Sequence, residues 1–99
     1  MYDMANIAKL KTLRQHAPAA MDAFFAFDKA VFTEGALTVK VKELIAVAVA
    51  VTTQCPYCIE IHVQKAKAAG ATDAELTEAT LVAAALRAGG SITHGTHAV

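Results

Sequence analysis

The chain has 99 residues, of which 56% are hydrophobic, and its nine lysine and arginine residues balance nine aspartate and glutamate residues. This length supports one hydrophobic core and excludes a second, so residues 1–99 are predicted to form a single domain. Neither sign of charge clusters, which excludes a basic surface that follows a nucleic-acid backbone, and nucleic acid is therefore not an expected partner.

The hydrophobic content exceeds the ~45–50% usual in soluble domains, although so short a chain buries only about 60–65% of its unfolded surface. Apolar surface is therefore left over. The longest wholly apolar run, Leu44 to Val51, is far shorter than the ~18 residues of a membrane span, so a membrane is not expected as a partner. We predict instead a homo-oligomer whose copies cover one another's apolar faces.

The first six residues, Met1 to Asn6, lack the basic stretch and apolar core of a signal peptide. We therefore expect a cytoplasmic protein, in a compartment that keeps thiols reduced. Both cysteines belong to one Cys-x-x-Cys unit, Cys55 and Cys58. In such a compartment this spacing indicates redox chemistry or metal binding rather than a permanent disulfide.

Helices are predicted throughout, because Ala, Leu, Lys and Glu dominate and no turn signal joins two β-branched runs. The first helix is expected over residues 4–15, since the residue before Pro18 is pushed out of the helical region. A second helix begins at Pro18, which suits a first turn, and reaches about residue 32. Its apolar side chains, interpreted as core, are Met21, Phe24, Phe25 and Phe27.

A third helix is predicted to follow Thr38, a suitable N-cap, and to reach about Thr53. The run from Leu44 to Val51 is apolar on every side, so this helix should be central. A run rich in Val and Ile could also form a buried strand. Its continuity with the preceding residues 39–43 makes it too long for a typical strand, and the helix is favoured.

The next helix is expected to begin at the Cys-x-x-Cys unit and to end at Gly70, a good C-cap. Thr72 and Glu75 have the spacing of a capping box, which starts a fifth helix that extends to about Ala88. The pair Gly89-Gly90 is predicted to interrupt it, and Ser91 to cap a short last helix. The expected architecture is an all-α bundle of about five to six helices.

The sequence Cys55-Pro56-Tyr57-Cys58 falls at a helix start, with Pro56 suited to the first helical position. Unpaired backbone N–H groups and the helix dipole there favour thiolate over thiol, so a lowered pKa is expected, above all for Cys58. His62 follows Cys58 by four residues and shares its helical face, which provides a base beside a nucleophilic sulfur.

Glu43 is the only carboxylate of the third predicted helix. Antiparallel packing of that helix against the next would bring Glu43 within about one turn of His62. Side chains lean toward the N-terminus of their own helix, which separates these two, so a bridging water and a direct hydrogen bond are both open. A carboxylate there would orient the imidazole and receive its proton.

Two other interpretations use the same cysteines. Zinc could be held by Cys55, Cys58, His94 and His97, in a scaffold that binds metal or senses redox state without catalysis. The histidine pair lies farther along the chain than is usual in compact zinc modules. Cys-Pro-Tyr-Cys is also the glutaredoxin pattern, but that fold needs a strand before the motif and a later proline, and the last proline here is Pro56.

Glu43, Cys55, Cys58 and His62, separated by eleven, two and three residues, together resemble the signature of the alkylhydroperoxidase D-like group within the carboxymuconolactone decarboxylase family. Residues 41–46 and 86–90 also look like family segments, and the resemblance extends from about Thr38 to the end. It implies an all-helical fold, assembly as trimers or hexamers, and an antioxidant oxidoreductase that reduces peroxides through its cysteines without a cofactor or metal.

The resemblance also implies a role for each residue. The attacking thiolate, oxidised to sulfenic acid, falls on Cys58; Cys55 is the proton donor and resolving thiol; Glu43 and His62 form the proton relay. The implied partners are a hydroperoxide and an external dithiol donor. Family peroxidases often have a histidine between the cysteines, where this chain has Pro56-Tyr57. General thiol–disulfide exchange remains an alternative, and lactone decarboxylation is disfavoured because that branch generally lacks the cysteine pair.

Overall fold

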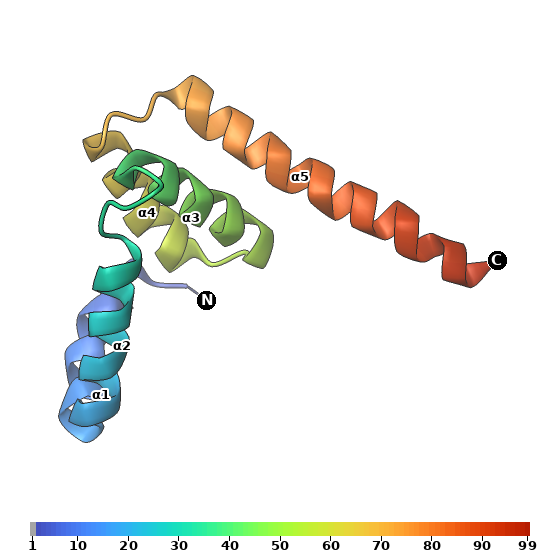
Figure 1. Cartoon of the computed structure of the whole chain (residues 1–99). Helices are drawn as coiled ribbons and strands as arrows, with labels where there is room; N and C mark the ends of the chain where they lie inside the picture. The colour runs from blue at the N-terminus through green and yellow to red at the C-terminus, as the bar shows by residue number, and fades with distance from the viewer. Residues whose placement is uncertain (1) are drawn as a thin grey trace.

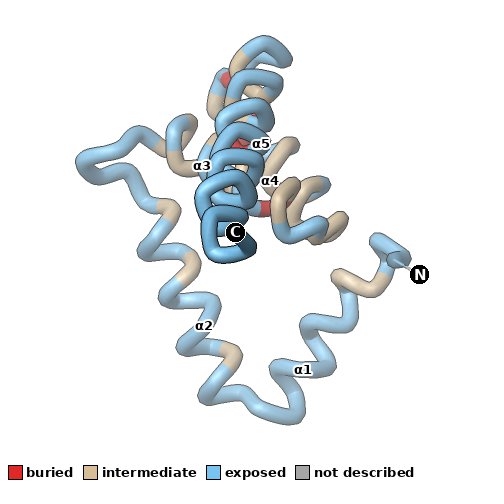
Figure 2. Tube along the Cα trace, turned by 90° about the vertical axis from the view of Figure 1, so that its right-hand side faces the viewer, coloured by how far each residue is buried: buried red, intermediate tan, exposed pale blue. Residues whose placement is uncertain are grey.

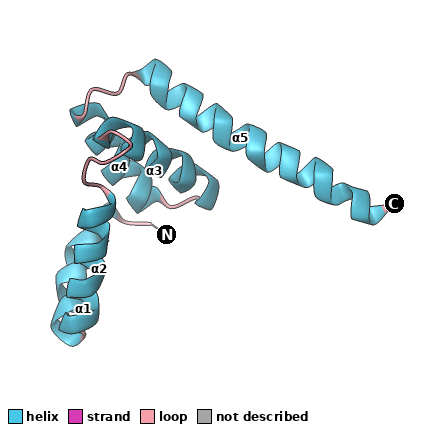
Figure 3. Cartoon of the chain, viewed as in Figure 1, coloured by secondary structure: helices cyan, strands magenta, loops and turns pink. Residues whose placement is uncertain are grey.

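The computed structural model describes residues 2–99, and all regular structure in that range is helical (Figures 1 and 3). The elements are the 3₁₀ helix η1 (Met4–Lys9), α1 (Leu10–His16), α2 (Pro18–Val31), α3 (Val39–Thr53), α4 (Pro56–Ala68), α5 (Asp73–Gly95) and the 3₁₀ helix η2 (Thr96–Ala98). The all-α prediction is confirmed. The first predicted helix is divided into η1 and α1, and Met1 lies outside the described residues.

The first part of the chain is a hairpin of α1 and α2, which projects away from the other helices (Figure 1). The hairpin turns at Ala17, whose backbone leaves the helical region at φ −139° before Pro18 opens α2. The interpretation of the α2 aromatics as core is wrong within one chain: Phe24, Phe25 and Phe27 are 55%, 38% and 65% exposed. Within residues 2–99, α2 packs mainly against α1, whereas α3 packs against α4 and α5.

The centre of the fold is α3, which packs against both α4 and α5, as predicted. Its N-cap is Thr38, whose side chain accepts a hydrogen bond from the N–H of Val41 at 3.2 Å. The few buried residues lie on or around this helix (Figure 2). The buried apolar side chains are Val47, Ala50, Ala66, Ala71 and Ala83, and the only buried charged residue within residues 2–99 is Glu43.

The long helix α5 begins with the predicted capping box, in which Thr72 and Glu75 bond each other's backbone N–H groups at 3.1 and 3.0 Å. Lys40 then ties α3 to α5 through an ion pair of 2.9 Å with Glu75. The expected break at Gly89-Gly90 is wrong, and no separate helix starts at Ser91. Glycine costs a helix only about 1 kcal/mol, and no proline follows to stop it.

The chain is more extended than its length requires. Its radius of gyration is 16.3 Å, whereas a compact domain of this size has about 13 Å. The second half of α5 runs outward from α3 and α4 (Figure 1), and its Leu86 and Ile92 are 69% and 76% exposed. None of the helices within residues 2–99 is both long enough and apolar enough to cross a bilayer.

Candidate functional site

The turn between α3 and α4 positions the two cysteines. α3 ends at Gln54, which adopts the left-handed conformation at φ 55° and ψ 46°. The next N–H, of Cys55, donates to the carbonyl of Ala50 at 3.1 Å. Cys55 is the N-cap of α4, as predicted, and its sulfur accepts the N–H of Cys58 at 3.3 Å. Pro56 occupies the first turn, where its missing N–H leaves no bond unmade.

The sulfurs of Cys55 and Cys58 are 2.6 Å apart, both belong to free cysteines, and both residues are half-buried. A disulfide bond measures about 2.05 Å, so only a small movement separates the dithiol from its oxidised form. The two thiols are therefore close enough to be joined by a disulfide bond.

The two sulfurs differ in acidity. The pKa of Cys55 is lowered, first by the hydrogen bond with the Cys58 side chain and next by the backbone N–H of Cys58. The same sulfur–sulfur hydrogen bond, followed by burial and the nearby charge, raises the pKa of Cys58 to about 11. The expected lowering at Cys58 is therefore wrong. The N–H of Cys58 at the helix terminus bonds the sulfur of Cys55, not that of Cys58. A thiolate at Cys58 would also place a second negative charge beside that of Cys55, which is unfavourable.

The carboxylate and imidazole predicted to meet are in direct contact. Glu43 Oε2 lies 2.7 Å from His62 Nδ1, and the two side chains are 3% and 16% exposed. An ionised carboxylate can only accept, so the proton of the neutral imidazole sits on Nδ1. The opposite nitrogen, Nε2, is then free to accept a proton from elsewhere, which is the geometry of an oriented general base.

The dithiol and the Glu43–His62 pair are neighbours on α4. His62 follows Cys58 by one helical turn, a spacing at which Cβ atoms lie about 5–6 Å apart. Within residues 2–99, no hydrogen bond joins His62 to either sulfur. A proton that passes between them therefore needs a bridging water or an atom of a bound substrate.

Two aromatic contacts at the site were not predicted. The ring of Phe32 stacks on His62 with centroids 5.0 Å apart and planes inclined by 22°. The hydroxyl of Tyr57 accepts a 3.3 Å hydrogen bond from Asn6, and its ring meets Tyr2 edge-on at 5.6 Å. These contacts join residues far apart in sequence, and no periodicity or spacing announces them.

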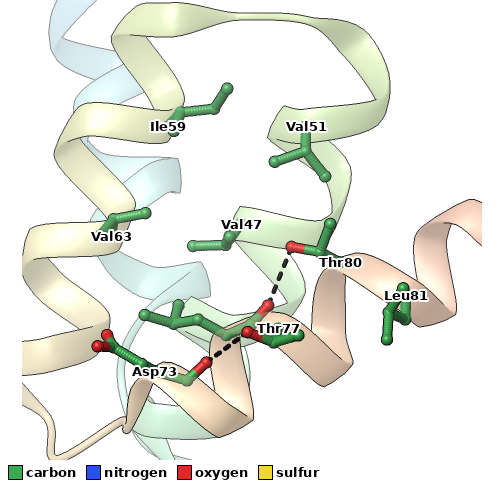
Figure 4. A pocket seen from close by; sticks show the side chains of 9 residues that line it. Val47, Val51, Ile59, Val63, Asp73, Thr77, Thr80 and Leu81 are labelled. Carbon is green, nitrogen blue, oxygen red and sulfur yellow. Dashed lines mark hydrogen bonds between the residues drawn. The ribbon is translucent and has the colours of Figure 1, made fainter.

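A shallow apolar groove of about 370 Å³ lies between α3, α4 and α5 (Figure 4). Its lining residues are Val47, Val51, Ile59, Val63, Asp73, Leu76, Thr77, Thr80 and Leu81. Neither cysteine lines it, and neither do Glu43 and His62. The groove is therefore separate from the dithiol.

The structure does not assemble the alternative zinc site. Among residues 2–99, no three His, Cys, Asp or Glu side chains are grouped so as to hold a metal ion. The rings of His94 and His97 are 6.0 Å apart. His94 lies in the last turn of α5 and His97 in η2, and this end of the chain extends away from α4 (Figure 1).

Comparisons with known proteins point to one family. The family model of the carboxymuconolactone decarboxylase family matches residues 18–99. The chain is 53% identical over 78 residues to a Paracoccus denitrificans protein, "Uncharacterized protein 4 in cox locus", covering 79% of this chain and 70% of that one.

Two crystal structures resemble the fold closely. A protein from Methanobacterium thermoautotrophicum is 38% identical with a TM-score of 0.80, over 86% of this chain and 96% of that one. A carboxymuconolactone decarboxylase family protein from Legionella pneumophila, in its apo form, is 37% identical with a TM-score of 0.77, over 91% and 80% of the two chains. The chain belongs to the carboxymuconolactone decarboxylase family.

Proposed function

We propose that this protein is a thiol-dependent peroxidase that reduces hydroperoxides through a dithiol/disulfide cycle of Cys55 and Cys58, with Glu43 and His62 as its proton relay. The observation that carries the proposal is one arrangement on α4: two sulfurs 2.6 Å apart at its start, and one turn later an imidazole bonded to a buried carboxylate at 2.7 Å. The pair of sulfurs supplies two electrons, and the relay supplies a base.

The proposed cycle starts with the proton of Cys58. With a pKa near 11 this thiol is protonated at neutral pH, and His62, one turn along α4, is the base that takes its proton through a bridging water or an atom of the bound hydroperoxide. The Cys58 thiolate attacks the O–O bond of the hydroperoxide, which breaks to give a sulfenic acid and an alkoxide, and the alkoxide takes the proton from His62. Glu43 stabilises the imidazolium in the interval.

Cys55 completes the oxidation. Its lowered pKa makes it the readier thiolate, and it attacks the sulfenic sulfur of Cys58. A disulfide forms and hydroxide leaves, to be protonated as water. An external dithiol then reduces the disulfide by two exchange steps and is itself oxidised. The cycle needs a compartment that keeps such donors reduced, as the cytoplasm does.

The test is steady-state turnover of hydrogen peroxide and an alkyl hydroperoxide with dithiothreitol as donor. Cys58→Ser should abolish turnover. After removal of dithiothreitol, Cys55→Ser should undergo one oxidation per chain, to a sulfenic acid that reacts with dimedone. His97→Gln, far from the dithiol, serves as the control for His62→Gln. Dithiol consumption that depends on peroxide and is unchanged in Cys58→Ser would exclude this function.

General thiol–disulfide exchange is a second candidate, favoured by one observation. The lowered pKa of Cys55 and its N-cap position make it a suitable attacking thiolate for a disulfide substrate, with Cys58 as the resolving thiol. This activity would turn over a small disulfide without peroxide, and it would be lost in Cys55→Ser at the first step.

We also propose that the protein works as a homo-oligomer, a trimer or a hexamer. The isolated chain exposes 7265 Å², whereas a folded monomer of this mass exposes roughly 5,400 Å². The excess of about 1,900 Å² per chain is on the scale of an obligate interface. The groove of Figure 4 and the outer half of α5 are the apolar surfaces that a second copy would cover.

A further inference from the structure

The imidazole of His62 is held by two contacts of different kinds. One is at its edge, where Nδ1 meets Glu43 at 2.7 Å. The other is on its face, where Phe32 stacks at 5.0 Å with planes inclined by 22°. The hydrogen bond fixes the position of one nitrogen but leaves the ring able to rock about that bond, because the χ2 torsion of histidine has a broad minimum. The stacked ring removes this freedom.

Phe32 is itself anchored to α3. It is the C-cap of α2, and its N–H donates to the carbonyl of Asp28 at 3.1 Å. The ammonium of Lys42 donates to the carbonyls on either side of Phe32, those of Val31 at 2.7 Å and Thr33 at 2.6 Å. Lys42 directly precedes Glu43 in the chain. Two consecutive residues of α3 therefore hold the edge of the imidazole and the backbone that carries its stacking partner.

We infer that Phe32 is a positioning residue for His62, which keeps the ring plane such that Nδ1 stays on Glu43 and Nε2 points in one direction. The inference rests on the proposed function, because the orientation of Nε2 matters where it exchanges a proton. Its physical content is independent of turnover: without the stacked ring, the imidazole should sample other orientations and its Nδ1–H···carboxylate bond should be made less often.

The alternative is that Phe32 merely fills space, and three variants separate the two roles. Phe32→Leu keeps an apolar side chain of similar bulk but cannot stack. Phe32→Tyr keeps the ring and should restore the effect. Phe27→Leu is the control, since Phe27 lies on the same helix and is 65% exposed. Thermal unfolding of all three, followed by circular dichroism, reports any general loss of packing.

The direct readout is nuclear magnetic resonance of ¹⁵N-labelled histidine in the reduced protein. In the wild type, the Nδ1–H proton of His62 should be downfield and protected from exchange, with ¹⁵N shifts of the Nδ1–H tautomer. In Phe32→Leu the exchange should quicken and the second tautomer should appear. The rate of peroxide-driven disulfide formation should fall about 2- to 10-fold, the range expected for one lost aromatic pair. Phe32→Tyr and Phe27→Leu should behave as the wild type.

A further variant removes the hydrogen bonds that hold the backbone around Phe32 and leaves its ring unchanged. Lys42→Met removes both hydrogen bonds to the backbone around Phe32 and leaves every site residue in place, so it should reproduce the tautomer change in weaker form. An unchanged His62 spectrum in Phe32→Leu, or failure of Phe32→Tyr to restore it, overturns the inference. If the spectrum changes as expected while the wild type turns over no peroxide, the positioning role stands and the proposed function fails.

Discussion

The two sulfurs of the Cys-x-x-Cys unit are unequal because only one of them is placed at the N-cap. Cys55 accepts the N–H of Cys58 at 3.3 Å, whereas Cys58 lies further inside and faces the charge of its partner. The difference in acidity between the two sulfurs therefore follows from their hydrogen bond to each other and from the position of Cys55 at the N-cap.

This inequality gives a prediction for thiol alkylation. When the reduced protein is treated with iodoacetamide between pH 5 and 11 and each site is quantified by mass spectrometry, the rate at Cys55 should level off at a pH below that of an ordinary cysteine. The rate at Cys58 should continue to rise toward pH 11, since its pKa is raised to about 11. Equal profiles that resemble free cysteine would contradict the assigned acidities and the order of proton transfers in the proposed cycle.

The buried carboxylate gives a second prediction. Glu43→Gln preserves the shape of a side chain that is almost fully buried, but removes the charge that stabilises protonated His62. Peroxide-driven disulfide formation should slow by roughly 100-fold, the lower range for loss of general base catalysis. Glu60→Gln is the matched control, because Glu60 is an exposed acid of α4 that bonds Gln64. A similar loss in both variants would argue against the relay.

Sequence spacing predicted the meeting of the site residues and could not predict their surroundings. The four-residue separation of Cys58 and His62 and the antiparallel packing of α3 and α4 were enough to bring Glu43 near. The contacts of Phe32 and Tyr57 were not predicted, because they depend on how residues 2–37 fold back onto α4. No repeat or periodicity in the sequence indicates that packing. The acidity of Cys58 was misjudged because the helix-terminal N–H could serve either sulfur.

At the scale of elements, the two ends of the long helix α5 differ in how well the local sequence predicts them. The capping box of Thr72 and Glu75 could be recognised in the sequence because it satisfies two backbone N–H groups within four residues. The glycine pair was misread because two helix-weakening residues do not terminate a helix that is already propagating. Helix starts were therefore better predicted than the end of α5.

The glycines of α5 should be replaceable. A methyl group at Gly89 or Gly90 would meet no atom of the chain within 4 Å beyond the neighbouring residues and backbone of its own helix. Gly90→Ala should stabilise the outer half of α5 by about 1 kcal/mol, the difference in helix propensity, and should slow amide exchange in residues 86–95. Ser91→Ala, a neighbouring change on the same helix, is the control for altered side-chain volume. Faster exchange in Gly90→Ala would mean that another chain approaches the helix closely there.

The ion pair between α3 and α5 has a pH signature. Lys40, and next the N–H of Thr72, lower the pKa of Glu75. The ion pair therefore contributes its full stability above the ordinary pKa near 4.5 and loses it as pH falls through the lowered folded-state value. Glu75→Gln keeps the capping box, so urea unfolding should show it slightly less stable than wild type at pH 7 and equal to it in stronger acid. A difference that persists undiminished in acid would exclude this ion pair as its cause.

At the scale of the molecule, the chain leaves large apolar side chains uncovered at both extremities. The hairpin of α1 and α2 and the outer half of α5 extend from a small centre, over 51 × 34 × 28 Å (Figures 1 and 2). Composition predicted a surplus of apolar surface, and the structure places it on these two arms and on the outer face of α3, where Ile45 and Val49 are exposed. It could not be located from sequence, because the amphipathic pattern of a helix is the same whether its own chain or a copy covers it.

The oligomer proposal is tested by light scattering on the purified protein. Leu86 and Ile92 are 69% and 76% exposed on α5, and in an assembly that covers them Leu86→Glu with Ile92→Glu should shift the mass toward that of a single chain of 10.4 kDa. Replacing the two exposed polar residues Thr93 and Ser91 by Glu is the control for added charge. A wild type that is monomeric at micromolar concentration would contradict the proposal.

One carbonyl at the end of α3 has a spectroscopic consequence. The oxygen of Ala50 accepts the N–H groups of both Gln54 and Cys55, whereas an ordinary helical carbonyl accepts one N–H. Such crowding weakens the C=O stretch. A ¹³C label at this carbonyl should give an infrared band below those of its neighbours, and a shift of that band on oxidation would report a change in these hydrogen bonds without a probe on either sulfur.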